Sequence, residues 1–137
     1  MTTDDNIKVV QEAYAAFGRG DIPALLAHLD EKVEWVTPES VPLAAAGKLS
    51  GANAVAGFFQ SIGQAWEFEA FEPREFIASG DRVMVVGRYR ARARSTGRVM
   101  ASEWVMDFRV RGGKVTRFQE YTDTAVLRDA LVAQAAA

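Results

Sequence analysis

The side chains available for chemistry in this sequence are mainly carboxylates, arginines and tyrosines. The 137 residues include no cysteine and one histidine, His28. Thiolate metal sites, disulfides and a cysteine nucleophile are therefore excluded, and a histidine metal cluster or a Ser-His-Asp triad is hard to build. No glycine-rich phosphate loop or dinucleotide fingerprint is present. We therefore expect no required cofactor and no metal.

Glu120 is the strongest candidate for acid–base chemistry. It lies in the alternating stretch Lys114–Thr122, which follows two glycines, Gly112 and Gly113. A three-residue hairpin turn ending in these glycines would place Glu120 opposite Trp104, on the same interior face as Phe118. Burial there would raise the pKa of the carboxyl group toward the range useful for general acid–base catalysis.

A second register remains open for the same hairpin. A two-residue turn would put Gln119 and Tyr121 inside and leave Glu120 outside, paired with a surface arginine. The three-residue turn is favoured because it buries Phe118 and leaves Arg117 outside.

The other candidate site residues are mostly aromatic and can line a pocket for a flat, hydrophobic ligand. Glu39, just after Pro38, is a second carboxylate at the expected pocket mouth. The alternative for each aromatic residue is simple core filling. The predicted binding residues are Trp35, Thr37, Glu39, Phe58, Phe59, Trp104, Met106, Phe108 and Phe118.

The elements that must position these residues change type near residue 65. Apolar residues spaced by three and four predict helices before that point, and alternation with a period of two predicts strands after it. The first expected helix has Ile7, Val10, Tyr14 and Phe17 on its apolar face, with Asp4 or Asp5 capping its start and Gly18 and Gly20 stopping it. The other expected helices are residues 22–29, 52–62 and 124–132, and the expected strands are 32–37, 68–76, 82–94, 99–111 and 114–122. Residues 38–51 are expected to form a loop. Short turns between successive strands require antiparallel pairing, so we predict an α+β fold in a single domain, residues 1–137.

Charge and hydropathy narrow the function classes. Sixteen Lys and Arg against eighteen Asp and Glu give a net charge of −2, which argues against nucleic acid or an anionic membrane as partner. Arg88, Arg90, Arg92 and Arg94 alternate along one strand, and a two-residue turn at Thr96-Gly97 would place Arg90 opposite Glu103. We interpret this stripe as a solvated or dimer-facing surface. A three-residue turn would instead direct Arg88 and Arg90 inward, as ligands for an acidic substrate. No signal peptide or membrane span is recognised, so we expect a cytoplasmic protein.

The order of several motifs resembles a known superfamily. These motifs are FGRGDIPALLAHL, EWVTP, LSGANAVAGFF and GGKVTRFQEYTDTAVL. They are similar to the nuclear-transport-factor-2-like (NTF2-like) superfamily, and within it to SnoaL-like and ketosteroid isomerase-related proteins. The resemblance implies a cone-shaped α+β barrel, in which three N-terminal helices pack on a strongly bent, largely antiparallel sheet around a pocket. It also implies a homodimer through the outer face of the sheet.

The residues of the steroid isomerase mechanism are not present at the matching positions. Thr37 stands at the position of the carboxylate base, Ala13 at that of the helix tyrosine, and Met106 at that of the oxyanion-stabilising acid. Phe59 replaces a further pocket tyrosine. Steroid isomerisation by that mechanism is therefore not expected.

The resemblance and the residues together predict a SnoaL-like protein that binds a hydrophobic cyclic or aromatic small molecule. If it is an enzyme, a cofactor-independent isomerase, cyclase or dehydratase using Glu120 fits best. The alternative is a non-catalytic binding or dimerisation module of the same fold.

Overall fold

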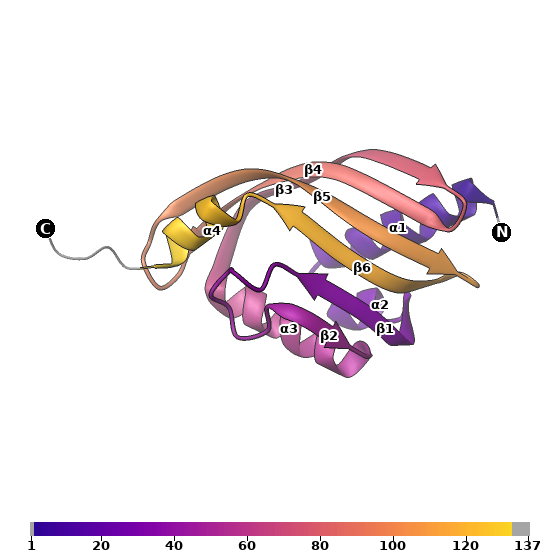
Figure 1. Ribbon diagram of the computed structural model, residues 1–137, viewed down its shortest axis with the longest axis horizontal. Coiled ribbons are helices and arrows are strands. Elements are labelled where there is room, and N and C mark those ends of the chain that lie inside the picture. Colours follow the sequence, from indigo (N-terminus) through magenta and orange to yellow (C-terminus); the bar gives the residue numbers. More distant parts are fainter. Residues whose placement is uncertain (1, 133–137) are drawn as a thin grey trace, which may run out of the picture.

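A computed structural model describes residues 2–132 as one curved sheet with helices on its concave side (Figure 1). The helices are α1 (Thr3–Gly18), α2 (Ile22–Leu26), α3 (Ala52–Ala65) and α4 (Thr124–Leu131). The strands are β1 (Leu29–Thr37), β2 (Gly47–Ser50), β3 (Trp66–Ser79), β4 (Arg82–Ala93), β5 (Val99–Arg111) and β6 (Lys114–Thr122).

The sheet has the strand order β2-β1-β6-β5-β4-β3. Strands β3 to β6 form an antiparallel meander, whereas β1 joins β6 in parallel. A parallel neighbour needs a long connection, and the chain from β1 to β6 provides one. The sheet is mixed, strongly bent and open, and the predicted α+β class is confirmed (Figure 1).

The core lies between the concave face of the sheet and the helices. In α1, the buried apolar residues Val10, Ala13 and Ala16 recur every three residues, so one stripe faces the sheet. Buried and exposed residues alternate along most of β4, as expected of a strand with one face packed and one face outside. Helix α1 packs against β3, and α3 packs against β1.

Strand β2 corrects one expectation, since residues 38–51 were predicted to be loop throughout. Gly47–Ser50 pairs antiparallel with β1, with Leu49 opposite Trp35. Four residues are too few for a period of two to be recognised in the sequence. The strand forms because β1 would otherwise present an unpaired edge.

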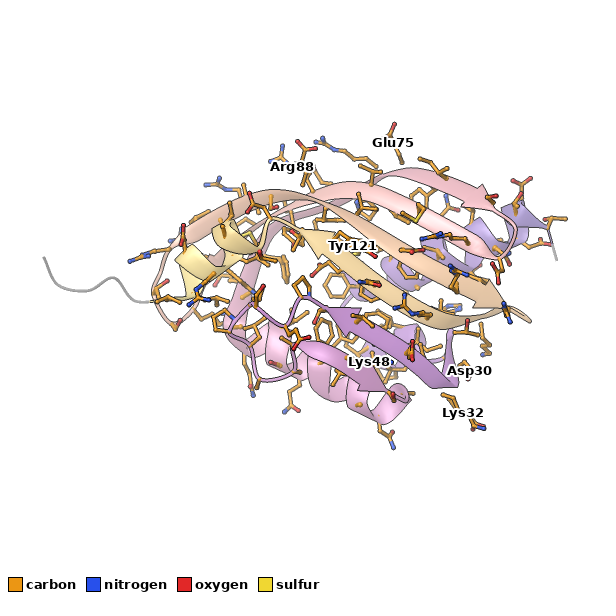
Figure 2. The ribbon with its side chains drawn as sticks, viewed as in Figure 1. Asp30, Lys32, Lys48, Glu75, Arg88 and Tyr121 are labelled. Carbon is orange, nitrogen blue, oxygen red and sulfur yellow. The ribbon has the colours of Figure 1, made fainter. Side chains whose placement is uncertain are left out.

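The arginine stripe of β4 lies on the convex face, as predicted. Arg88 projects outward in Figure 2 and lies 3.6 Å from Glu72, and Arg90 lies 2.8 Å from Glu69, both glutamates being on β3. The predicted pairing of Arg90 with Glu103 is wrong, because the connection between β4 and β5, residues 94–98, is longer than a two-residue turn. Arg88 stands opposite Glu103 instead, and the even shift leaves every arginine on its predicted face.

The middle of the convex face carries an apolar row across three strands. Val86, Val105 and Tyr121 are direct cross-strand neighbours, and Tyr121 is 50% exposed. Beside this row, the buried carboxylate of Asp107 accepts two hydrogen bonds from the Arg82 guanidinium, at 3.0 and 2.6 Å. Within residues 2–132, no helix is long and apolar enough to cross a membrane.

Candidate functional site

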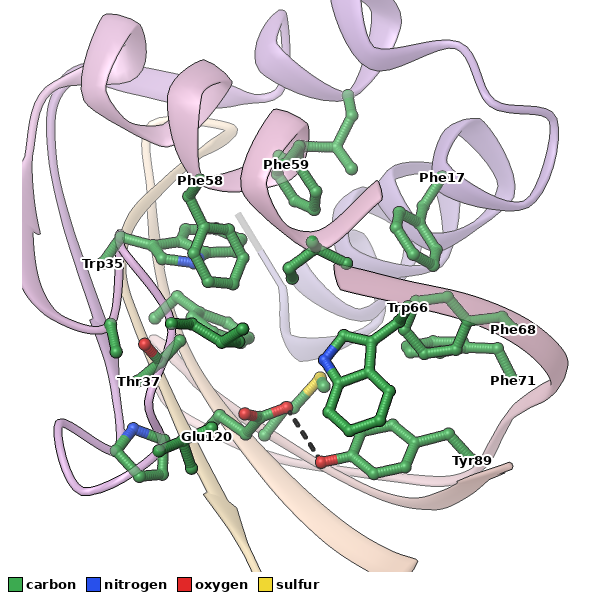
Figure 3. A pocket seen from close by; sticks show the side chains of 18 of the residues that line it. Phe17, Trp35, Thr37, Phe58, Phe59, Trp66, Phe68, Phe71, Tyr89 and Glu120 are labelled. Carbon is green, nitrogen blue, oxygen red and sulfur yellow. Dashed lines mark hydrogen bonds between the residues drawn. The ribbon is translucent and has the colours of Figure 1, made fainter. Parts of the chain in front are cut away.

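The candidate site is a cavity of about 100 Å³ between the concave sheet face and the helices (Figure 3). Side chains from α1, α3, α4 and every long strand line it, together with the loop that follows Pro38. Nearly all of them are apolar. A cavity of this kind is suited to a hydrophobic ligand oriented by a few polar groups.

Aromatic rings form most of the cavity wall. The Trp35 indole stacks on Phe118 with 3.9 Å between ring centroids, and Phe58 and Phe59 pack at an angle to that indole. Phe17 of α1 packs on Phe59 from the opposite side. Because aromatic side chains have few rotatable bonds, such a wall keeps its shape and favours flat, apolar surfaces.

Glu120 extends from β6 into this cavity (Figure 3). Its side chain faces inward, as predicted, but its cross-strand neighbour is Met106 rather than Trp104. The turn at Gly112-Gly113 has two residues, because Arg111 pairs with Lys114. A bulge at Thr116 then inserts one extra residue into β6.

The bulge explains why a shorter turn did not expel Glu120. A two-residue turn alone would put Gln119 and Tyr121 inside, but one unpaired residue reverses the facing of everything beyond it. Phe118 and Glu120 are consequently returned to the interior.

The cavity strongly disfavours the charged form of Glu120. Burial among apolar groups raises the pKa of its carboxyl group from 4.5 to about 7, although a hydrogen bond from Tyr89 would lower it. The Tyr89 hydroxyl lies 3.5 Å from Glu120 Oε2. Burial, together with the nearby Glu120, also raises the pKa of Tyr14. A carboxyl group that titrates near neutrality can both give and accept a proton.

Tyr89 is a polar cavity residue that the sequence analysis missed. Its hydroxyl donates to Thr122 Oγ1 at 2.7 Å, and Thr122 lies 3.2 Å from the Ser102 hydroxyl. The signal was available, because Arg88 and Arg90 on the outer face require Tyr89 to face inward.

Two further polar groups in the cavity wall have no hydrogen-bond partner among the described residues. These are the Thr37 hydroxyl and the Trp35 indole N–H, each buried. A buried polar group without a partner is costly. Both groups line the cavity and are available to hydrogen-bond a ligand.

The structure brings most of the predicted site residues together. Those that line the cavity are Trp35, Thr37, Phe58, Phe59, Met106, Phe108, Phe118 and Glu120. Trp104 and Glu39 do not. The Trp104 ring is packed behind the wall against Tyr14 and Phe71, and Glu39 is exposed because the chain turns outward after Pro38.

The positions at which the steroid isomerase residues were sought also meet in this cavity. Ala13, Thr37 and Met106 all line it. None of these three residue types carries a carboxylate, so the cavity lacks the groups of the steroid isomerase mechanism at these positions. Across residues 2–132, no group of three or more His, Cys, Asp or Glu side chains could hold a metal ion.

An open, bent α+β sheet closed by helices over an aromatic pocket with one inward carboxyl group defines an NTF2-like pocket protein. A family model of the SnoaL-like domain matches residues 10–118. The chain belongs to the SnoaL-like domain family.

Similar proteins agree with this assignment. The uncharacterized protein Rv0034 of Mycobacterium tuberculosis is 30% identical over 126 residues, covering 91% of this chain and 95% of the relative. An NTF2-like protein of Burkholderia xenovorans has a crystal structure that superposes with a TM-score of 0.88, at 40% identity, covering 96% of this chain and 99% of the other. The structure of TerC co-crystallized with polyporic acid gives a TM-score of 0.85 at 29% identity, covering 93% and 98% of the two chains.

Proposed function

We propose that this protein binds a hydrophobic cyclic or aromatic small molecule and transfers protons on it through Glu120. The reaction class is a cofactor-independent isomerisation, cyclisation or dehydration. One observation carries the proposal: a carboxyl group whose pKa is raised to about 7 is directed into an aromatic cavity.

The geometry supports a division of labour within the cavity. Trp35, Phe59 and Phe118 offer flat apolar surfaces, while Thr37 offers a donor to a ligand oxygen. Glu120 would give a proton to one ligand atom and take one from another, which needs no metal or redox partner. That TerC was crystallised with polyporic acid supports a small organic ligand for this fold.

The proposal can be tested with 2-tetralone, a flat ring ketone with acidic C–H bonds. Binding is followed by quenching of tryptophan fluorescence, since Trp35 and Trp66 line the cavity. Proton transfer is followed by NMR as exchange of ligand C–H for deuterium in heavy water at neutral pH. We expect exchange with the native protein and its loss in Glu120→Gln.

Glu39→Gln provides the matched control, because Glu39 is exposed and does not line the cavity. This variant should exchange the C–H hydrogens of 2-tetralone for deuterium as fast as the native protein does. Binding without exchange in the native protein would contradict an acid–base role and support the non-catalytic binding module instead.

We also propose that two copies associate through the convex face. The support is the apolar row of Val86, Val105 and Tyr121, together with the exposed Ile77 opposite Met84 on the same face. A two-fold axis through this row would bury the same patch on both copies.

A further inference from the structure

Three hydroxyl groups connect Glu120 to a backbone carbonyl, and we call Tyr89, Thr122 and Ser102 the hydroxyl ladder. Tyr89 Oη lies 2.7 Å from Thr122 Oγ1, which lies 3.2 Å from Ser102 Oγ. Ser102 Oγ lies 2.8 Å from the carbonyl oxygen of Glu103. Each hydroxyl has one proton to donate, so the direction of every bond can be worked out from the carbonyl end.

The carbonyl fixes the first proton because it can only accept. Ser102 donates to it, and Ser102 Oγ also accepts from the backbone N–H of Asp123 at 3.3 Å. With its one proton committed, Ser102 can only accept from Thr122. Thr122 must then donate to Ser102 or to the Glu103 carbonyl oxygen, 3.5 Å away, and in both cases it accepts from Tyr89.

This order leaves the Tyr89 proton directed away from the cavity. The Tyr89 hydroxyl is also placed to donate to Glu120 Oε2 at 3.5 Å, but its one proton goes to Thr122 Oγ1, which lies closer at 2.7 Å. The contact with Glu120 is then a hydrogen bond only if Glu120 is the donor. An ionised Glu120 would set its lone pairs against those of Tyr89. The neutral carboxyl group is favoured for a geometric reason that is separate from burial.

We propose that Thr122 and Ser102 are positioning residues that hold Glu120 as a neutral acid, by keeping the Tyr89 proton turned away from the cavity. Glu120 therefore meets the ligand as a proton donor. The proton that leaves its carboxyl group binds the ligand, and a proton lost from a neighbouring ligand carbon returns to the carboxylate. The catalytic meaning rests on the proposed function, but the protonation state does not require a ligand.

Few other ionisable groups surround Glu120. Among the described residues that line the cavity, α1 contributes Tyr14 and β4 contributes Tyr89. The lining residues from β1, α2, α3, β3, β5, α4 and the loop after Pro38 contribute none. The titration of Glu120 therefore reports mainly on burial and on the hydroxyl ladder.

The experiment is an NMR titration of the ligand-free protein, with glutamate labelled at the side-chain carboxyl carbon. The Glu120 signal is identified by its absence in Glu120→Gln. In Thr122→Val, the Tyr89 proton loses its acceptor and turns to Glu120. We expect the pKa of Glu120 to fall by about one unit, the effect of one added hydrogen bond to a carboxylate.

Companion variants separate the ladder from a change in packing. Thr122→Ser keeps the hydroxyl and should keep the native pKa. Ser102→Ala leaves Thr122 only the Glu103 carbonyl oxygen, 3.5 Å away, as acceptor, and this weaker anchor should lower the pKa of Glu120 by a smaller amount. Ser79→Ala, which removes an exposed hydroxyl outside the ladder, should leave the pKa of Glu120 unchanged. If Thr122→Val does not fold, Ser102→Ala carries the test alone.

Tyr89→Phe decides between the two directions of the Tyr89 bond. If Tyr89 donated to Glu120 in the native protein, removing its hydroxyl would raise the pKa of Glu120 by about one unit. The ladder predicts no rise. A rise in Tyr89→Phe, or an unchanged pKa in Thr122→Val and Ser102→Ala, would overturn the proposal. Neither result depends on whether 2-tetralone is bound or exchanged.

Discussion

The Trp104 indole occupies the space that a side chain at Gly87 would need. The two residues are cross-strand partners on β5 and β4, and a Cβ atom at Gly87 would lie 2.5 Å from a ring carbon of Trp104. The same Cβ would lie 2.5 Å from the backbone oxygen of Glu72 on β3. This close approach lets the ring lie flat on the strand behind the cavity wall.

Gly87→Ala should therefore destabilise the protein. Neither the indole nor the β3 backbone can move away cheaply, and we expect a loss of about 1–3 kcal/mol in the free energy of unfolding. Urea denaturation measures it. The control is Gly57→Ala on α3, where nothing lies within 4 Å, and this variant should be neutral or more stable by up to about 1 kcal/mol.

Stability should depend on pH through Glu120. Its folded-state pKa of about 7 lies above the ordinary value of 4.5, so the group favours folding below about pH 4.5 and this contribution is lost as the pH rises through 7. Each pKa unit corresponds to about 1.4 kcal/mol, so the loss is on the order of 3 kcal/mol.

Glu120→Gln removes this titration at nearly constant size. Above pH 7 the variant should be the more stable protein, and the advantage should shrink as the pH falls toward 4.5. Urea unfolding of both proteins across this range gives the difference between their free energies of unfolding. The other carboxylates contribute equally to both proteins and do not affect this difference. An advantage that does not vary with pH would show that Glu120 titrates normally.

Thr37→Val should stabilise the ligand-free protein. The Thr37 hydroxyl is buried without a partner, and valine has nearly the same shape, so we expect a gain of about 1–2 kcal/mol in the free energy of unfolding. The same change at Thr96 should cost about 1 kcal/mol, because Thr96 Oγ1 donates to the carbonyl of Ala130. A weaker affinity of Thr37→Val for 2-tetralone, by fluorescence, would show that the hydroxyl serves the ligand.

Arg82→Ala should destabilise the protein, because the buried carboxylate of Asp107 would lose its partner. The Asp107 side chain is 4% exposed and loses both guanidinium donors in this variant. We expect a loss of about 2–3 kcal/mol. Arg74→Ala removes an exposed pair with Glu72 and should cost less than about 1 kcal/mol in the same urea experiment.

Tyr121→Lys should separate the proposed dimer into monomers. Tyr121 is half exposed on the convex face, so a charge there should prevent burial against a second copy without disturbing the core. Light scattering should give about twice the 15.0 kDa chain mass for the native protein and about one chain mass for the variant. A measured mass of one chain for the native protein at micromolar concentration would contradict the proposed dimer.

The sequence specified the strands better than their registers. The bounds of β5 and β6 match the prediction, because alternation and paired glycines are strong local signals. The bulge at Thr116 has a weaker signal, the three-residue spacing between the buried Val115 and Phe118, which breaks the alternation without a glycine to mark the extra residue. The turn is one residue shorter than predicted and β6 contains one extra residue, so the partner of Glu120 shifts by two positions, from Trp104 to Met106. A shift of two leaves the facing of Glu120 unchanged, and its predicted face was therefore correct.

The sequence predicted which residues line the cavity better than it predicted the hydrogen bonds between them. The lining aromatics follow from alternation, and Glu120 follows from its position among them. The contact between Tyr89 and Thr122 joins residues 33 positions apart on β4 and β6, strands that are not neighbours in the sheet. A bond across an intervening strand depends on the bend of the sheet, which no local pattern encodes.

The unpaired Thr116 sets the pairing register of β6, and this register decides which side chains of β6 enter the cavity. All side chains from Arg117 to Thr122 keep their facing because of this one unpaired residue. If Thr116 instead paired with Arg109 in a regular hairpin, Glu120 would turn toward solvent and Gln119 and Tyr121 would enter the cavity, exchanging a carboxyl group for an amide and a phenol. Loss of the Thr116 codon would remove the bulge and keep Glu120 inside, so the carboxyl group of the cavity depends on which residues pair and not on the identity of Thr116.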